Sequence, residues 1–157
     1  MCHYCGCREI PLIKEFIAEH ESVTDAAGGA LRALDSGDRG LAAELVARMG
    51  RELRAHWQGE EQGLFAVMSG DAEYAGYIEA LVAEHRELAA FLDQVDLGRA
   101  EDVVRLREAV DELHHHIAKE EDGLFPASLT ALSGDEWDLS MAAWRTAHPD
   151  ARGRLGR

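Results

Sequence analysis

Residues 56–65 read HWQGEEQGLF, and residues 116–125 read HIAKEEDGLF. The two stretches share a histidine, a glutamate four positions later, a second glutamate, and then Gly-Leu-Phe. Residues 17–21, IAEHE, similarly resemble residues 81–87, LVAEHRE. The motifs therefore follow one another as His, His-x-x-x-Glu, His, His-x-x-x-Glu, which is the pattern of two copies of one helical hairpin.

Apolar residues recur at alternating spacings of three and four in four segments, as in amphipathic helices. These segments cover residues 10–34, 45–64, 78–95 and 106–124. Turn-forming residues separate them, and we expect the fourth helix to stop at Pro126 because proline breaks helix interiors. Short connections make neighbouring helices antiparallel. The sequence predicts an all-α fold, an up-down antiparallel four-helix bundle with a short C-terminal helical extension.

Three segments follow from this pattern. Residues 1–9 form a Cys-rich N-terminal segment, residues 10–130 the bundle, and residues 131–157 a short helix and tail. A length of 157 residues is typical of one domain. Trp137 and Trp144 are available to pack the extension against the bundle.

The charge balance excludes several classes of function. Sixteen Lys and Arg stand against 30 Asp and Glu, which gives a formal net charge of −14. A general nucleic-acid binder needs a basic face, so we expect no nucleic-acid partner. No apolar run approaches the roughly 20 residues of a membrane span, and the N-terminus lacks the features of a signal peptide. We therefore expect a cytoplasmic protein without a membrane partner.

Six polar residues occupy stripe positions where leucine or isoleucine is expected. They are His20, His56, Glu60, His85, His116 and Glu120. Burying charged groups without partners is costly, so this set calls for a cation in the core. Residues four apart share a helix face, and each His-x-x-x-Glu pair therefore aims two donors at one point.

The heights of the histidines support this interpretation. Positions 20 and 56 lie equally far from residue 38, inside the first turn. The midpoint of positions 56 and 85 falls beside Gly70, and the midpoint of positions 85 and 116 falls just after Gly98. All four histidines are therefore predicted at one level of the bundle. A single histidine on an apolar face is usually a hydrogen-bonded core residue. The repeated motif, the inward placement and the equal height together favour a metal site.

Neighbouring residues of similar chemistry are expected outside the ligand set. His114 and His115 lack a glutamate four residues later, so we expect them to flank the site. Glu61 and Glu121 follow the ligand glutamates by about 100° of helix and should face outward or sideways.

Imidazole and carboxylate donors together suit iron, manganese, zinc or copper rather than calcium or magnesium. Six donors exceed what one tetrahedral zinc ion uses. Two ions bridged by Glu60 and Glu120 fit the set. Positions then remain open for an oxo bridge and a small ligand.

At these residues the chain resembles the hemerythrin-like family, in its HHE cation-binding branch with the pattern H-HxxxE-H-HxxxE, over roughly residues 12–127. The resemblance implies a non-haem di-iron centre, with oxo and carboxylate bridges, held by the six residues named above. Zinc or manganese can substitute for iron in such a site. The implied partner is a small-molecule ligand: peroxide, dioxygen or nitric oxide.

Oxygen-carrying members of the family have a further histidine four residues after the third-helix histidine, and an aspartate after the last ligand histidine. Here Ala89 and Glu120 stand in these roles. Reversible oxygen carriage is therefore disfavoured.

Several functions stay open. One is an enzyme with catalase- or peroxidase-like activity, or activity towards nitric oxide, in oxidative stress. Another is an iron-, oxygen- or redox-sensing or metal-binding module without turnover. Iron storage is the weakest, because one di-iron site in 17.3 kDa stores little.

Cys2, Cys5 and Cys7 crowd the N-terminus, and no other cysteine follows. Their C-x-x-C-x-C spacing offers soft donors for zinc or a cluster. Two of the thiols could instead form a reversible disulfide. Packing over the end of the bundle is the third alternative for this separate thiol site.

Replacing Cys2, Cys5 and Cys7 together with serine is expected to leave the bundle folded and its metal site loaded. The reason is that the thiols precede the helical stripes and lie several turns before His20. Circular dichroism and metal content of the triple variant test this, and a folded variant without metal would show that the terminus contributes to the site.

Overall fold

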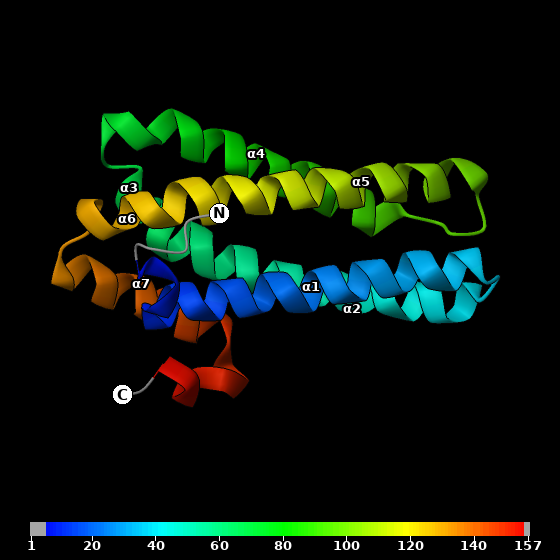
Figure 1. Cartoon of the computed structure of the whole chain (residues 1–157), viewed down its shortest axis with the longest axis horizontal. Coiled ribbons are helices and arrows are strands. Elements are labelled where there is room, and N and C mark those ends of the chain that lie inside the picture. Colours follow the sequence, from blue (N-terminus) through cyan, green and yellow to red (C-terminus); the bar gives the residue numbers. More distant parts are fainter. Residues whose placement is uncertain (1–5, 156–157) are drawn as a thin grey trace.

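The computed structural model describes residues 6–155, and at Cys7 and Arg152 the backbone alone. Within this range the chain forms helices and turns (Figure 1). The helices α1 (Pro11–Asp35) and α2 (Arg39–Gly59) form one antiparallel hairpin, and α4 (Ala72–Gln94) and α5 (Ala100–Lys119) form the other. Figure 1 shows the two hairpins lying over one another with their long axes aligned. The predicted four-helix bundle is confirmed.

Short polar side chains set the helix starts. Asp38 accepts a hydrogen bond from the backbone N–H of Leu41 at 3.0 Å, and Asp71 accepts one from Glu73 at 2.9 Å. These contacts satisfy N–H groups that have no partner inside the helix. Gly37 takes a positive φ of 81°, which permits the tight turn between α1 and α2.

Both copies of the repeated motif leave the α-helical path at the same place. Glu60–Leu64 (η2) and Glu120–Leu124 (η3) are π-helical turns, in which the N–H of Phe65 or Phe125 bonds to the carbonyl five residues earlier. The helices then continue as α3 (Phe65–Met68) and α6 (Phe125–Ala131). Such turns occur frequently at functional sites.

The prediction that the fourth helix stops at Pro126 is wrong, because Pro126 lies in the first turn of α6. An interior proline lacks an N–H and clashes with the carbonyl four residues earlier. In the π turn just before it, the N–H of Phe125 bonds to the carbonyl of Glu120, so the regular α-helical hydrogen-bond pattern is already interrupted here. The helix can therefore pass through the proline.

The apolar core consists of two clusters with a polar layer between them. One cluster, which includes Val23 and Leu106, fills the end near the α1–α2 turn. The other, which includes Leu12 and Phe65, lies beneath α3 and α6. The six predicted site residues form the layer, and none is more than 5% exposed. The four histidines come from four different helices, as their distances from the turns predict.

The C-terminal extension is α7 (Gly134–Ala147), followed by the 3-10 segment η4 (Pro149–Leu155); a further short turn, η1 (Cys7–Glu9), precedes α1. Ser133 and Glu136 form a capping box at the start of α7. The helix packs against η2, and its Trp144 is completely buried in the second cluster. None of the described helices is both long enough and apolar enough to cross a membrane.

Gly63 permits the close approach of α7 to η2. A Cβ atom there would lie 3.0 Å from both the Ala143 Cβ and the Ser140 carbonyl oxygen. At Gly123, the equivalent position in the second copy, the nearest atom is the Tyr77 hydroxyl, at the end of a movable side chain.

We therefore predict that Gly63→Ala lowers the free energy of unfolding by about 1–3 kcal/mol, the usual cost of overpacking. The matched variant Gly123→Ala should cost less, because Tyr77 can move aside. Denaturant unfolding of both variants provides the measurement. A larger loss of unfolding free energy in Gly123→Ala than in Gly63→Ala would contradict the view that close packing by α7 makes Gly63 the more sensitive position.

Candidate metal centre

The four histidines meet in two pairs in the bundle core. The Nε2 atoms of His20 and His56 lie 3.0 Å apart, inside the first hairpin. The Nε2 atoms of His85 and His116 also lie 3.0 Å apart, inside the second hairpin. The repeated sequence motif therefore produces a repeated geometry.

A carboxylate holds the other ring nitrogen of each histidine. The contacts at Nδ1 are Glu121–His20 (2.9 Å), Glu19–His56 (3.1 Å), Glu61–His85 (2.8 Å) and Glu84–His116 (2.6 Å). An ionised carboxylate only accepts hydrogen bonds, so the proton of each neutral imidazole lies on Nδ1. The Nε2 lone pairs are thereby directed into the core.

Two ring nitrogens that face each other at 3.0 Å need either a shared proton or a metal ion between them. Burial lowers the pKa of His56 and of His116, but the neighbouring carboxylates outweigh it and raise both pKa values. Histidines that bind metals usually donate their second N–H to a carboxylate or carbonyl, which fixes the ring and raises its basicity. Both halves of the centre show this arrangement. The donor chemistry fits a metal ion at each pair.

Glu60 and Glu120 lie completely buried between the two pairs. The oxygens of Glu60 lie 3.1 Å from His56 Nε2 and 3.5 Å from His85 Nε2, so this carboxylate reaches both hairpins. Among the described residues, none of the four oxygens of Glu60 and Glu120 has a hydrogen-bond partner, despite these short distances. Buried carboxylates without hydrogen bonds are strongly unfavourable unless they face a cation.

The pKa values of these two carboxyl groups also reflect the cost of burying them close together. Burial raises the pKa of Glu60 well above its ordinary value, and the nearby Glu120 carboxylate raises it further. Burial also acts to raise the pKa of Glu120, but contacts with the Glu60 carboxyl and His116 outweigh it and lower that pKa. The two buried carboxyl groups thus lie close enough to shift each other's pKa in opposite directions. A cation between them would stabilise the ionised form of both.

Within residues 6–155, two groups of side chains bring their donor atoms within 4.8 Å of one another. One group is His20, His56, Glu60 and Glu120, and the other is His85, His116 and Glu120. Glu120 belongs to both. All six residues singled out from the sequence are therefore brought together. Cys2 and Cys5 lie outside the described residues, as does the side chain of Cys7, so the thiol site stays a prediction.

The four supporting carboxylates were not among the residues predicted from the sequence. Glu61 and Glu121, expected to face outward or sideways, reach the neighbouring hairpin and hold His85 and His20. Both glutamates lie in the π turns, where the rotation per residue of a regular α-helix does not give the direction of their side chains. The available signal was that each half repeats a glutamate directly before one histidine and a second glutamate directly after the ligand glutamate.

Both terminal segments contact these supporting carboxylates. Arg8 donates to Glu121 at 3.0 Å. Trp144 Nε1 donates to Glu19 at 3.3 Å, and His148 Nε2 forms an ion pair with the other oxygen of Glu19. Burial raises the pKa of Glu19, but the hydrogen bonds from His148 and His56 outweigh it and lower the pKa to about 2.

Aromatic rings pack against the imidazoles. Trp57 and Phe65 stack on His85 with centroid distances of 4.9 and 5.7 Å, and Phe125 stacks on His20 at 6.0 Å. These rings keep water away from the ring faces and strengthen the electrostatic interactions inside.

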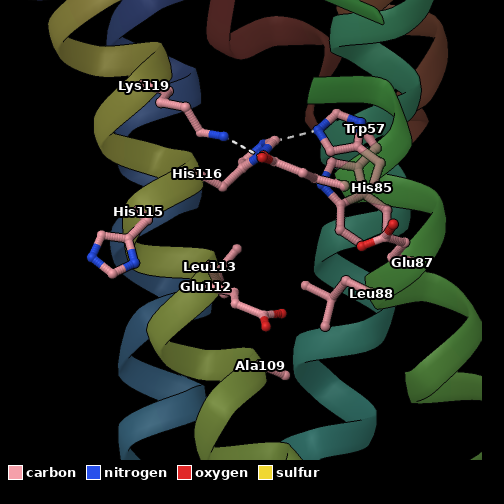
Figure 2. Close-up of a pocket in the computed structure, with 11 residues that line it drawn as sticks. Trp57, His85, Glu87, Leu88, Ala109, Glu112, Leu113, His115, His116 and Lys119 are labelled. Carbon is pink, nitrogen blue, oxygen red and sulfur yellow. Dashed lines mark hydrogen bonds and ion pairs between the residues drawn. The ribbon is translucent and has the colours of Figure 1, made fainter. Parts of the chain in front are cut away.

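A pocket of about 210 Å³ lies between α4 and α5 and reaches the centre (Figure 2). His85 and His116 line it beside the centre, while Leu88 and Leu113 line it about one turn further along the same helices, towards Ala109. Lys119 forms an ion pair with Glu84 at the same wall. His114 and His115 are exposed and flank the site, as expected.

The Hemerythrin HHE cation binding domain family matches residues 12–128, most of the chain. No curated protein and no solved structure matches the chain significantly.

The supporting carboxylates generate a prediction about metal affinity. Glu121→Ala is expected to weaken metal binding about 10- to 100-fold, the usual effect of removing such a partner. Glu21→Ala, an exposed glutamate next to His20 on the same helix, is the matched control and should change little. Metal retained during dialysis against graded chelator measures both, and equal retention by the two variants would contradict the role of Glu121.

Proposed function

The chain belongs to the hemerythrin HHE cation-binding family, and from this premise we propose that it binds two iron ions and reacts with a small oxygen species. The proposed ligands are His20, His56, Glu60, His85, His116 and Glu120. One observation carries the proposal: two facing pairs of imidazole nitrogens are joined by two buried carboxylates without hydrogen bonds. That arrangement fits two cations that share both carboxylates.

Iron is the proposed metal because mixed imidazole and carboxylate ligation suits it and because reactions of oxygen species require a change of redox state. Manganese offers the second choice on the same grounds, whereas zinc can occupy the site without supplying electrons. When bound, the iron pair supplies open coordination positions and electron transfer to the small molecule.

The protein supplies position and surroundings for this chemistry. The carboxylates at Nδ1 hold each imidazole in one tautomer and one orientation. The stacked aromatic rings limit water. Ala89, one turn after His85, packs against the first apolar cluster and adds no imidazole. The centre therefore keeps more room for an external ligand, which favours reaction with peroxide or nitric oxide over reversible storage of dioxygen.

A sensing or metal-binding module without turnover is the alternative function. The contacts of Arg8 and His148 favour it, because they join both terminal segments to carboxylates of the centre. A change at the metals could then alter the surface formed by these segments. Turnover by the isolated protein separates the two functions.

Protein loaded with ferrous iron without oxygen is expected to bind two ions per chain and then to evolve oxygen from hydrogen peroxide. His116→Ala removes a proposed ligand and should lose both metal and activity. Elemental analysis, an oxygen electrode and the visible absorption spectrum are the measurements.

At most one ion per chain would contradict the dinuclear proposal. Two ions with no reaction towards peroxide or nitric oxide would favour the sensing module. A stable adduct that releases dioxygen reversibly would favour oxygen carriage instead.

A further inference from the structure

The two halves of the centre differ in what covers them. The pocket between α4 and α5 is lined by His85 and His116 themselves. On the opposite side, a hollow of about 400 Å³ is lined by Glu19 and His148, and none of the four histidines of the core borders it. Of these two hollows, only the first reaches the proposed ligands.

The asymmetry begins at one position of the repeated motif. Three residues after the motif histidine, the first copy has Gly59 and the second has Lys119. A Cβ atom at Gly59 would lie 3.5 Å from Trp144 and 3.6 Å from His148, so α7 packs directly on this glycine. Lys119 instead forms part of the pocket wall (Figure 2). The repeat therefore provides a closed half and an open half.

The two halves also differ in the number of side chains that could bind a metal ion. In the closed half the donor atoms of four side chains lie within 4.8 Å of one another, whereas in the open half those of three do. An ion in the open half has fewer donor atoms gathered closely around it, even with Glu60 3.5 Å from His85, and it lies beside the pocket. Both conditions are needed for an external ligand to bind.

We propose that the metal position at His85 and His116 receives the small-molecule ligand, and that the pocket between α4 and α5 is its access route. The position at His20 and His56 is then the closed, structural one of the pair. This inference rests on the proposed function, which names the metals but not the side from which a ligand arrives.

The pocket also selects the class of ligand. Its volume of about 210 Å³ lies below that of pockets for drug-sized molecules, so only small ligands fit. Leu88, Leu113 and Ala109 give it apolar walls, while Glu84, Glu87 and Glu112 outnumber Lys119. Lys119 is already paired with Glu84, and Arg105 pairs with Glu112 from outside the lining.

Glu84 and Glu112 are thus paired with cations, and Glu87 is the carboxylate of the lining that has no such partner among the described residues. On a chain of net charge −14 it disfavours a small anion, whereas an uncharged molecule meets no such barrier. The pocket therefore admits uncharged ligands such as hydrogen peroxide, dioxygen or nitric oxide faster than anions such as azide.

The access route is tested with two tryptophan variants of the iron-loaded protein. Leu88→Trp fills the pocket, and Ala55→Trp fills the hollow on the opposite side. Metal content is measured first, and stopped-flow absorption then gives the rate of nitric oxide binding. We expect both variants to keep two ions, Leu88→Trp to bind nitric oxide about tenfold more slowly, and Ala55→Trp to match the unmodified protein within about twofold.

Charge selection is tested with azide as the anion. Glu87→Gln combined with Glu112→Gln should raise the azide binding rate several-fold and leave the nitric oxide rate unchanged. The matched control combines Glu21→Gln with Glu44→Gln, which removes the same charge from exposed positions of the first hairpin. Should Leu88→Trp fail to fold, Leu88→Ala widens the pocket and should speed nitric oxide binding.

Each outcome decides between the two proposals. If the unmodified protein does not bind two metal ions, the proposed function is overturned and this inference with it. If the protein binds two ions but its rate of nitric oxide binding changes with Ala55→Trp and not with the Leu88 variants, only the access route is overturned. Equal effects of both charge-removing pairs on azide binding would overturn the selection by charge.

Discussion

Two imidazole nitrogens that face each other at 3.0 Å need a proton or a metal ion between them, and this protein contains two such pairs. The rest of the centre follows from that constraint. The nitrogens face inward because carboxylates fix the proton of each ring on its other side. Three of those four carboxylates, Glu121, Glu84 and Glu19, are held in turn by Arg8, Lys119, Trp144 and His148, which come from both terminal segments as well as from the bundle. The core, the supporting layer and the terminal segments therefore form one connected arrangement around the two metal positions.

The bundle and the six central residues could be predicted from the sequence because both depend on simple periodicity. Spacings of three and four place side chains on one helix face, and equal distances from turns place histidines at one height. The continuation through Pro126 could not be predicted in this way. It depends on a π turn, which changes the hydrogen-bond pattern without a signal in the apolar periodicity. The contacts of Glu61 and Glu121 were missed for the same reason.

Other features escaped the sequence analysis because they depend on distant segments. Glu19 and His148 are far apart in the chain, and their contact exists only because α7 folds back over Gly59. The open pocket is equally invisible in the sequence, since it results from the spacing between α4 and α5. The difference between Gly59 and Lys119 at the same position of the two motif copies is visible in the sequence. That α7 packs on Gly59 can be seen only in the structure.

The polar layer between the two apolar clusters also affects how the protein unfolds. Each cluster stabilises its own end of the bundle, while the layer between them contributes little apolar burial and contains carboxylates that are unfavourable without a cation. Metal ions that bind only the folded state stabilise that middle layer, because ligand binding shifts the unfolding equilibrium by mass action. The loaded chain should therefore unfold as one cooperative unit, while in the metal-free chain the two ends can open separately and exchange their amide hydrogens at different rates.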